Sequence, residues 1–156
     1  MDRQRREELI ARYKDGYRVV AAALAGITEA ELDARPAPGK WSAREIVHHL
    51  ADSEMTSAIR LRLLVAEERA AIRAYDEAEF ARTLHYDRPI ASSLLAFEAA
   101  RSSTGDLLDR MSEADWAKEG THPEHPRYGV EHWLEIYATH AHNHADQITR
   151  ARASAR

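Results

Sequence analysis

Apolar side chains recur every three to four residues along four long stretches of the chain, the spacing of helices that bury one face. The stretches cover approximately residues 3–25, 42–67, 92–111 and 130–151. Convincing alternation of apolar and polar side chains, which would predict a strand, is absent from the sequence. The pattern therefore predicts an all-α fold, namely a four-helix bundle.

Residues typical of helix ends support these boundaries. Ser42 followed by Glu45 matches a capping box, in which each side chain binds a free backbone amide at the start of a helix. Trp41 and Ile46 flank this start at the spacing of a hydrophobic staple. Gly26 ends the first helix, because glycine readily adopts the left-handed conformation common at helix C-termini.

Two of the connections between the helices are long. Residues 68–90 are expected to contain a short helix near residues 76–84. Residues 112–116 are predicted to form a single turn, and two prolines break residues 117–129 into a loop. Connections of this length leave room for a crossover and argue against a plain up-down-up-down bundle.

The composition narrows the class of protein. With 156 residues, 44% of them hydrophobic, the chain is expected to form one domain over residues 1–156 with its core at about 10–150. The net charge of −4 and the scattered Lys and Arg residues predict neither a nucleic-acid nor a membrane partner. Cysteine is absent, which excludes disulfides and thiolate ligands, and a cytoplasmic protein is expected.

Histidine is the unusual residue type, with nine in the chain and six of them between His122 and His144. His140 and His144 are four residues apart and project from one face of the last helix, whereas His142 faces away. A chain with this many histidines is expected to contain about half a pair at this spacing by chance alone, so the spacing by itself is weak evidence for a metal site. The pair nevertheless lies on the apolar stripe of the helix, where buried imidazoles need partners.

The second helix offers a partner for this pair. His49 lies on the same side as Ile46 and Leu50, which predicts that it points inward as the third ligand of a metal ion. His48 is turned by about 100° toward the helix surface and is interpreted either as a flanking group or as one that supports a metal ligand without binding the ion. Asp52 would either orient His49 or remain a surface carboxylate.

Three histidines leave one coordination position open, which is typical of catalytic zinc sites rather than structural ones. A water or a thiol at that position would be the reactive group. A di-iron centre is rejected because the last helix lacks the Glu-x-x-His motif that such bundles use. The acidic residues of the last helix are expected at the surface; these are Glu131, Glu135 and Asp146.

Four sequence blocks carry a resemblance to a known family. They are GKWSAREIVHHLADSE, RLLVAEERAAIRAYDE, HPEH and EIYATHAHNHADQI. In this order and separation they resemble the DinB superfamily, particularly its YfiT-like branch of metal-dependent hydrolases, which includes bacillithiol S-transferases. The resemblance covers about residues 10–150.

The resemblance implies a four-helix bundle with a right-handed crossover, often dimeric, and a three-histidine site for one divalent metal ion. Zinc or nickel is expected, with manganese or iron as alternatives. The matching positions are His49, His140 and His144, in agreement with the arguments above. Two positions depart from the pattern, since Asn143 and Gln147 stand where relatives often have histidine.

Two functions remain as hypotheses. The first is a metal-dependent enzyme that hydrolyses a small molecule or transfers a low-molecular-weight thiol to it. The second is a non-catalytic bundle, either a metal-stabilised structural protein or a stress-associated binding module. An open pocket at the metal would favour the first hypothesis, and a sealed metal would favour the second.

Several other residues admit both a functional and a structural interpretation. His122 and His125 lie in a loop that either closes over the metal or is simply polar. Arg60 would bind an anionic group of the substrate or form a surface salt bridge. Tyr75 and Asp76 would line the pocket or form a turn.

Overall fold

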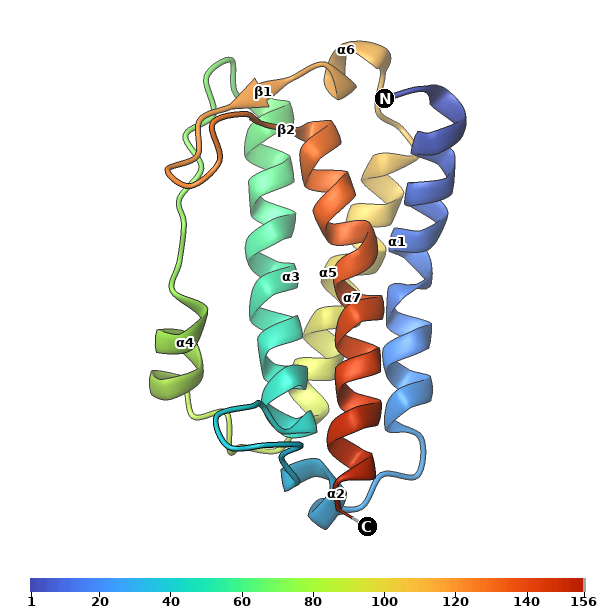
Figure 1. The fold of residues 1–156 in the computed structure, drawn as a ribbon. Helices are drawn as coiled ribbons and strands as arrows, with labels where there is room; N and C mark the ends of the chain where they lie inside the picture. The colour runs from blue at the N-terminus through green and yellow to red at the C-terminus, as the bar shows by residue number, and fades with distance from the viewer. Residues whose placement is uncertain (156) are drawn as a thin grey trace.

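The computed structural model describes residues 1–155. Its elements in chain order are α1 (Arg3–Leu24), α2 (Glu29–Asp33), α3 (Ala43–Ala66), α4 (Glu77–Thr83), α5 (Ala91–Leu108), α6 (Glu113–Trp116), β1 (Glu119–Gly120), β2 (Tyr128–Gly129) and α7 (Val130–Ala153). The four long helices pack as a bundle (Figure 1). The predicted all-α four-helix fold is confirmed, and each long helix matches its predicted stretch to within three residues at either end.

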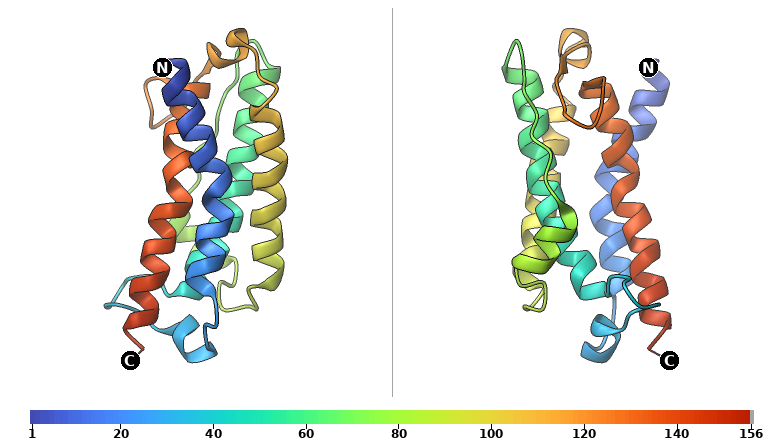
Figure 2. Two further views of the ribbon diagram at one scale, coloured as in Figure 1. Left: turned by 90° about the vertical axis from the view of Figure 1, so that its right-hand side faces the viewer. Right: turned by 60° about the vertical axis from the view of Figure 1, so that its left-hand side comes forward.

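The helices are not connected up-down-up-down. Figures 1 and 2 show that α1 and α7 run in one direction and that α3 and α5 run in the other. Between the two parallel helices α3 and α5, residues 67–90 return along the outside of the bundle and include α4. The predicted crossover is therefore present. It leaves α3 and α7 as neighbours along one face, beside the returning segment (Figure 2).

Local sequence signals set most helix ends as expected. Ser42 and Glu45 form both hydrogen bonds of the predicted capping box at the start of α3. Asp76 caps α4 by accepting from the backbone N–H of Glu79 at 3.0 Å, so the structural interpretation of this residue is confirmed. Gly26 has φ of +64°, which allows the chain to turn after α1. The predicted loop 117–129 also contains a short strand pair that the sequence pattern did not indicate, β1 with β2.

A charged network crosses the centre of the bundle. Arg101 of α5 and Glu54 of α3 are 2% and 1% exposed, and they form an ion pair. The Tyr13 hydroxyl donates to the same carboxylate, and Arg101 also donates to the backbone carbonyls of Tyr13 and Tyr137 at 2.6 and 2.9 Å. A Cβ on Gly16 would lie only 2.5 Å from the Arg101 side chain, so glycine makes room for the guanidinium. The network links all four long helices.

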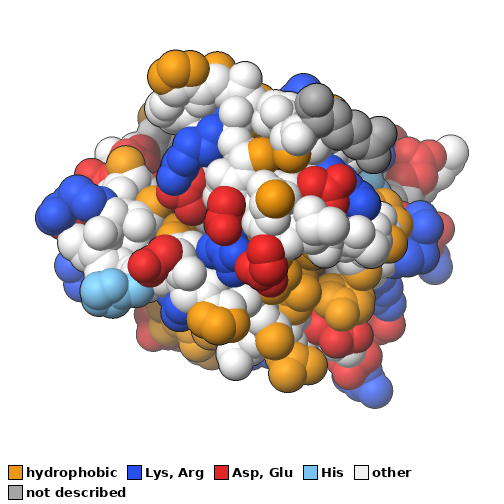
Figure 3. All heavy atoms as spheres, turned by 90° about the horizontal axis from the view of Figure 1, so that it is seen from below, with side chains coloured by type: hydrophobic (Ala, Val, Ile, Leu, Met, Phe, Trp, Pro, Cys, Tyr) orange, Lys and Arg blue, Asp and Glu red, His pale blue; other side chains and the backbone are white. Residues whose placement is uncertain are grey.

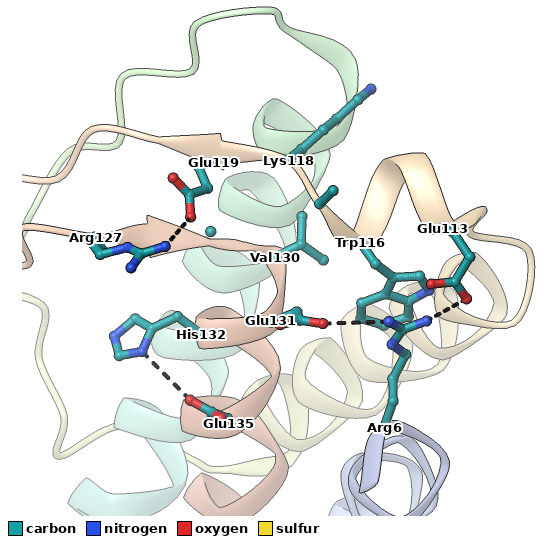
Figure 4. A pocket seen from close by; sticks show the side chains of 12 residues that line it. Arg6, Glu113, Trp116, Lys118, Glu119, Arg127, Val130, Glu131, His132 and Glu135 are labelled. Atoms are coloured by element: carbon teal, nitrogen blue, oxygen red, sulfur yellow. Dashed lines mark hydrogen bonds and ion pairs between the residues drawn. The ribbon is translucent and has the colours of Figure 1, made fainter. Parts of the chain in front are cut away.

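Ion pairs dominate both ends of the bundle. In Figure 3, basic and acidic side chains intermingle at the end that carries α2, where Arg44 pairs with Glu29 and Asp33. At the opposite end, Arg6 lies over the Trp116 ring and bridges Glu113 and Glu131, as Figure 4 shows. These contacts fasten α1 to α6 and α7. Within residues 1–155, the helices are too short or too polar to cross a membrane.

Candidate metal centre

His49 of α3 and the two α7 histidines meet in the seam between these helices. The Nε2 atom of His140 lies 3.4 Å from Nε2 of His49 and 3.2 Å from Nε2 of His144. His49 is 1% exposed, and the other two rings are partly buried. The three residues predicted from the sequence therefore come together, with one ligand atom of each within 4.8 Å of the others.

The spacing of these nitrogens fits a single bound metal ion. A tetrahedral ion with metal–nitrogen bonds of 2.0–2.1 Å places its ligand nitrogens about 3.3–3.4 Å apart. The two observed separations, 3.4 and 3.2 Å, are close to this value. The donor set consists of imidazoles alone, which suits zinc, nickel, copper or iron.

Gln147 places the proton of His144 correctly for this role. The Nδ1 atom of His144 lies 2.9 Å from the Oε1 atom of Gln147. A carbonyl oxygen only accepts hydrogen bonds, so Nδ1 carries the proton and Nε2 presents a lone pair to the cluster. Gln147 was noted in the sequence only as a departure from the family pattern. Its spacing of three residues from His144 was the signal for this contact.

The surroundings keep all three imidazoles neutral at neutral pH. Burial, and to a smaller extent the neighbouring His144, lowers the pKa of His49 to about 3. Burial also lowers the pKa of His140 well below its ordinary value, and His144 and His49 add to this effect. Burial lowers the pKa of His144, although the hydrogen bond with Gln147 has the opposite, smaller effect. Neutral imidazoles are the form that binds metal ions.

A surface pocket opens beside the cluster. It has a volume of about 580 Å³, and its lining includes His144, Gln147, Trp41 and Lys40. Trp41 stands against His49, with 4.7 Å between the ring centroids. Trp41, which precedes the N-cap residue of α3, therefore forms a wall of the pocket as well as packing on the core. The pocket gives solutes access to the cluster at His144.

The prediction that His48 lies toward the helix surface is wrong. It is fully buried and points away from the cluster, with Nε2 2.9 Å from the carbonyl of Arg88 and Nδ1 2.8 Å from the Ser93 hydroxyl. The two ring nitrogens of His48 thus connect α3 to α5 and to the segment that precedes α5. Asp52 accepts a hydrogen bond from the Tyr86 hydroxyl at 2.7 Å, so its partner is the crossover segment rather than His49.

The loop histidines occupy the other end of the seam. His122 stacks on Tyr128, with 4.8 Å between centroids, and His125 lies beside His122 and His132. His140 is ten residues beyond the start of α7, or about 15 Å of helical rise. The loop therefore does not close over the histidine cluster. His122, Glu124 and His125 form a second group with ligand atoms within 4.8 Å.

The acidic residues of α7 do not join the cluster. Glu135 and Asp146 are exposed, as expected. Glu131 is partly buried and binds the N-terminal amine and Arg6. His142 faces α1, where its Nε2 atom lies 3.0 Å from the carbonyl of Arg12, which confirms that it points away from the other histidines.

Comparison with known proteins agrees with this geometry. The family model of the DinB superfamily matches residues 12–148. The chain belongs to the DinB superfamily. One superfamily relative, from Oceanobacillus iheyensis, is 34% identical over 142 residues, which cover 91% of this chain and 83% of the relative. Another, from Geobacillus thermodenitrificans, is 30% identical over 151 residues, covering 94% and 83%. Both carry the name "putative metal-dependent hydrolase".

A solved structure from the same superfamily has closely similar topology. YfiT from Bacillus subtilis, described as a probable metal-dependent hydrolase with an unusual four-helix bundle topology, superposes with a TM-score of 0.89. The match is 28% identical and covers 96% of this chain and 86% of YfiT. The arrangement of α3 and α7 that brings the histidines together is therefore part of a fold shared within the superfamily.

Proposed function

We propose that this protein is a metal-dependent enzyme that binds one divalent ion through His49, His140 and His144. The close approach of three buried imidazoles carries the proposal, with the Nε2 atom of His140 3.4 Å from that of His49 and 3.2 Å from that of His144, and all three ligand atoms within 4.8 Å of one another. Zinc or nickel is the expected ion, because both accept an all-imidazole donor set. The names of the superfamily relatives point to the same class of protein.

The bound ion would act as a Lewis acid that lowers the pKa of a coordinated water or thiol and so prepares a nucleophile at neutral pH. The chain supplies the remaining requirements. Gln147 fixes the proton of His144 on Nδ1, and Trp41 limits the motion of the His49 ring and shields one side of the cluster from water. Burial keeps protons from competing for the three nitrogens.

The pocket at His144 favours an enzyme over a purely structural metal site. A structural ion is normally enclosed by four protein ligands. Here only three histidines are available, and one of them, His144, lines a pocket of about 580 Å³ that is open to the surface. We infer that a small-molecule substrate enters there and is either hydrolysed or joined to a low-molecular-weight thiol.

Metal binding is tested by measuring the metal content of the purified protein with and without the ligands. We expect about one ion per chain in the wild type and almost none in His49→Ala or His140→Ala. His142→Ala is the matched control, since this histidine lies on the same helix and faces α1. Equal metal content in all four proteins would contradict the ligand assignment.

The reaction is tested with a panel of thiols against a chromogenic aryl halide, and separately with a nitrophenyl ester. In the first assay a carbon–sulfur bond forms as halide leaves, and in the second water cleaves the ester. We expect one of the two reactions to require the ion. Equal rates for metal-loaded and metal-stripped protein in both assays would argue against an enzyme of this kind.

A further inference from the structure

Arg60 of α3 carries a positive charge into the α3–α7 seam without an acidic partner at ion-pair distance among the described residues. One terminal nitrogen donates to the Tyr137 hydroxyl at 3.2 Å, and the other donates to the backbone carbonyl of Arg73 at 2.7 Å. Both partners are neutral. The surface salt bridge considered for Arg60 is thus not formed, and its half-buried guanidinium is positioned by hydrogen bonds to neutral groups.

Three buried polar atoms around this guanidinium lack a hydrogen-bond partner in residues 1–155. They are the Arg60 Nε, the Tyr75 hydroxyl and the Tyr128 hydroxyl. Arg60 lies over the Tyr75 ring at 5.6 Å, and its charge acts on the Tyr128 phenol. Burial raises the pKa of Tyr75 to about 12 and raises that of Tyr128 as well, so both hydroxyls are donors at neutral pH. Unpartnered buried donors are rare in folded proteins and call for an occupant.

The charges around Arg60 define what the occupant can be. Glu77, at the start of α4, is near enough for Arg60 to lower its pKa against the larger, opposing effect of burial. The pKa of His122 is lowered by burial and by Arg60, so this ring adds no positive charge at neutral pH. One cation with a carboxylate in its neighbourhood suits a monoanion better than a doubly charged phosphate. A water molecule would accept hydrogen bonds from these donors but would leave the positive charge of Arg60 uncompensated.

This constellation adjoins the histidine cluster. Tyr137, whose hydroxyl accepts the hydrogen bond from Arg60, has its ring against the His140 ring, with 5.7 Å between centroids. A molecule held at Arg60 would therefore be separated from the proposed metal ligands by about one aromatic side chain.

We propose that Arg60, Tyr75 and Tyr128 bind a carboxylate group, and that the substrate of the metal centre carries this group. The Arg60 Nε and the two hydroxyls are donors without a partner near one guanidinium, which also donates to the Tyr137 hydroxyl and the Arg73 carbonyl. The substrate role rests on the proposed function, whereas carboxylate binding itself does not require the metal ion.

The test observes the Arg60 Nε–H directly by ¹⁵N NMR, with the resonance assigned through Arg60→Lys. Metal-free and zinc-loaded protein are each titrated with sodium acetate at constant ionic strength, with sodium chloride as the matched titrant. The expected result is a saturable shift of the Arg60 resonance with acetate and not with chloride. Arg62 is the internal control, because its guanidinium binds Ser103 and Thr104 on the opposite side of α3.

Conservative variants then test the donors. Tyr75→Phe and Tyr128→Phe are each expected to raise the dissociation constant for acetate by about threefold or more, the effect of one lost hydrogen bond. Glu77→Gln is expected to lower the dissociation constant for acetate, because it removes a negative charge that repels the carboxylate. Sodium sulfate in place of acetate is expected to bind more weakly.

The inference is overturned if the Arg60 resonance fails to saturate, responds equally to chloride, or is unaffected by both Tyr→Phe changes. Any of these outcomes would leave ordered water as the occupant. Metal content is measured on the same samples. A protein that binds acetate but no divalent metal ion would refute the proposed function alone, and one that binds a metal ion but no acetate would refute this inference alone.

Discussion

Neutralising Glu54 is expected to destabilise the protein severely. Glu54→Gln preserves the shape of the side chain but removes the negative charge that faces Arg101, which is 2% exposed. Breaking a buried ion pair by removing one partner costs about 3–5 kcal/mol, because the remaining charge is neither paired nor hydrated. With a urea dependence of about 2 kcal/mol per molar, the unfolding midpoint should fall by about 1.5–2.5 M.

Chemical unfolding in urea at 25 °C, followed by circular dichroism, measures this change. A double variant, Glu54→Leu with Arg101→Met, should recover part of the lost stability, since an apolar pair often replaces a buried ion pair without net loss. The recovery is incomplete because the buried Tyr13 hydroxyl loses its acceptor, at a cost of about 1–3 kcal/mol. The backbone carbonyls that Arg101 leaves behind lie within α1 and α7 and still accept helical hydrogen bonds. Glu7→Gln is the control, because its ion pair with Arg3 is exposed and its loss should leave the midpoint unchanged.

Two results would refute this reasoning. The first is a Glu54→Gln variant whose midpoint matches that of the Glu7→Gln control. The second is a double variant that is no more stable than Arg101→Met alone, since the penalty would then not come from an unpaired charge.

Three further predictions concern the metal centre and the helix packing. Gln147→Leu should weaken metal binding by about 10–100-fold, because His144 loses the acceptor for its Nδ1–H. Competition with a chromophoric chelator measures this affinity, and an unchanged value would show that the contact is dispensable. Gly16→Ala should lower the midpoint of thermal unfolding by several degrees, because a Cβ there would lie 2.5 Å from Arg101. A calorimetric midpoint equal to that of the wild type would contradict the close packing. Metal-free protein should lose stability as the pH falls below about 6.5, because His49 has a folded-state pKa of about 3, so the unfolded state binds the proton first. In urea titrations from pH 7 to 5, a His49→Ala variant should lose less stability than the wild type, and identical slopes would refute this origin.

The sequence was sufficient to predict the helices and the clustering of His49, His140 and His144, because both depend largely on short-range spacing. A buried helix face repeats every 3.6 residues, and the capping pair of Ser42 and Glu45 marks a helix start locally. The same spacing selected His49 over His48 as the inward residue. The family resemblance, later confirmed, pointed independently to the same three histidines.

Long-range partners could not be predicted in this way. His48 lies on a helix face that would be exposed on an isolated pair of helices, and it is buried because α5 and the crossover pack over it. The pairing of Arg101 with Glu54 joins residues 47 positions apart, and neither has a local pattern that indicates burial. The lack of an acidic partner for Arg60 likewise depends on where residues 73–77 return along α3.

The most direct measurement of the metal centre is anomalous X-ray diffraction at the absorption edge of the bound metal. We expect one strong peak about 2.0–2.1 Å from the Nε2 atoms of His49, His140 and His144. A metal-loaded crystal with no peak at this position, or with its principal peak at the group formed by His122 and His125, would contradict the proposed metal site.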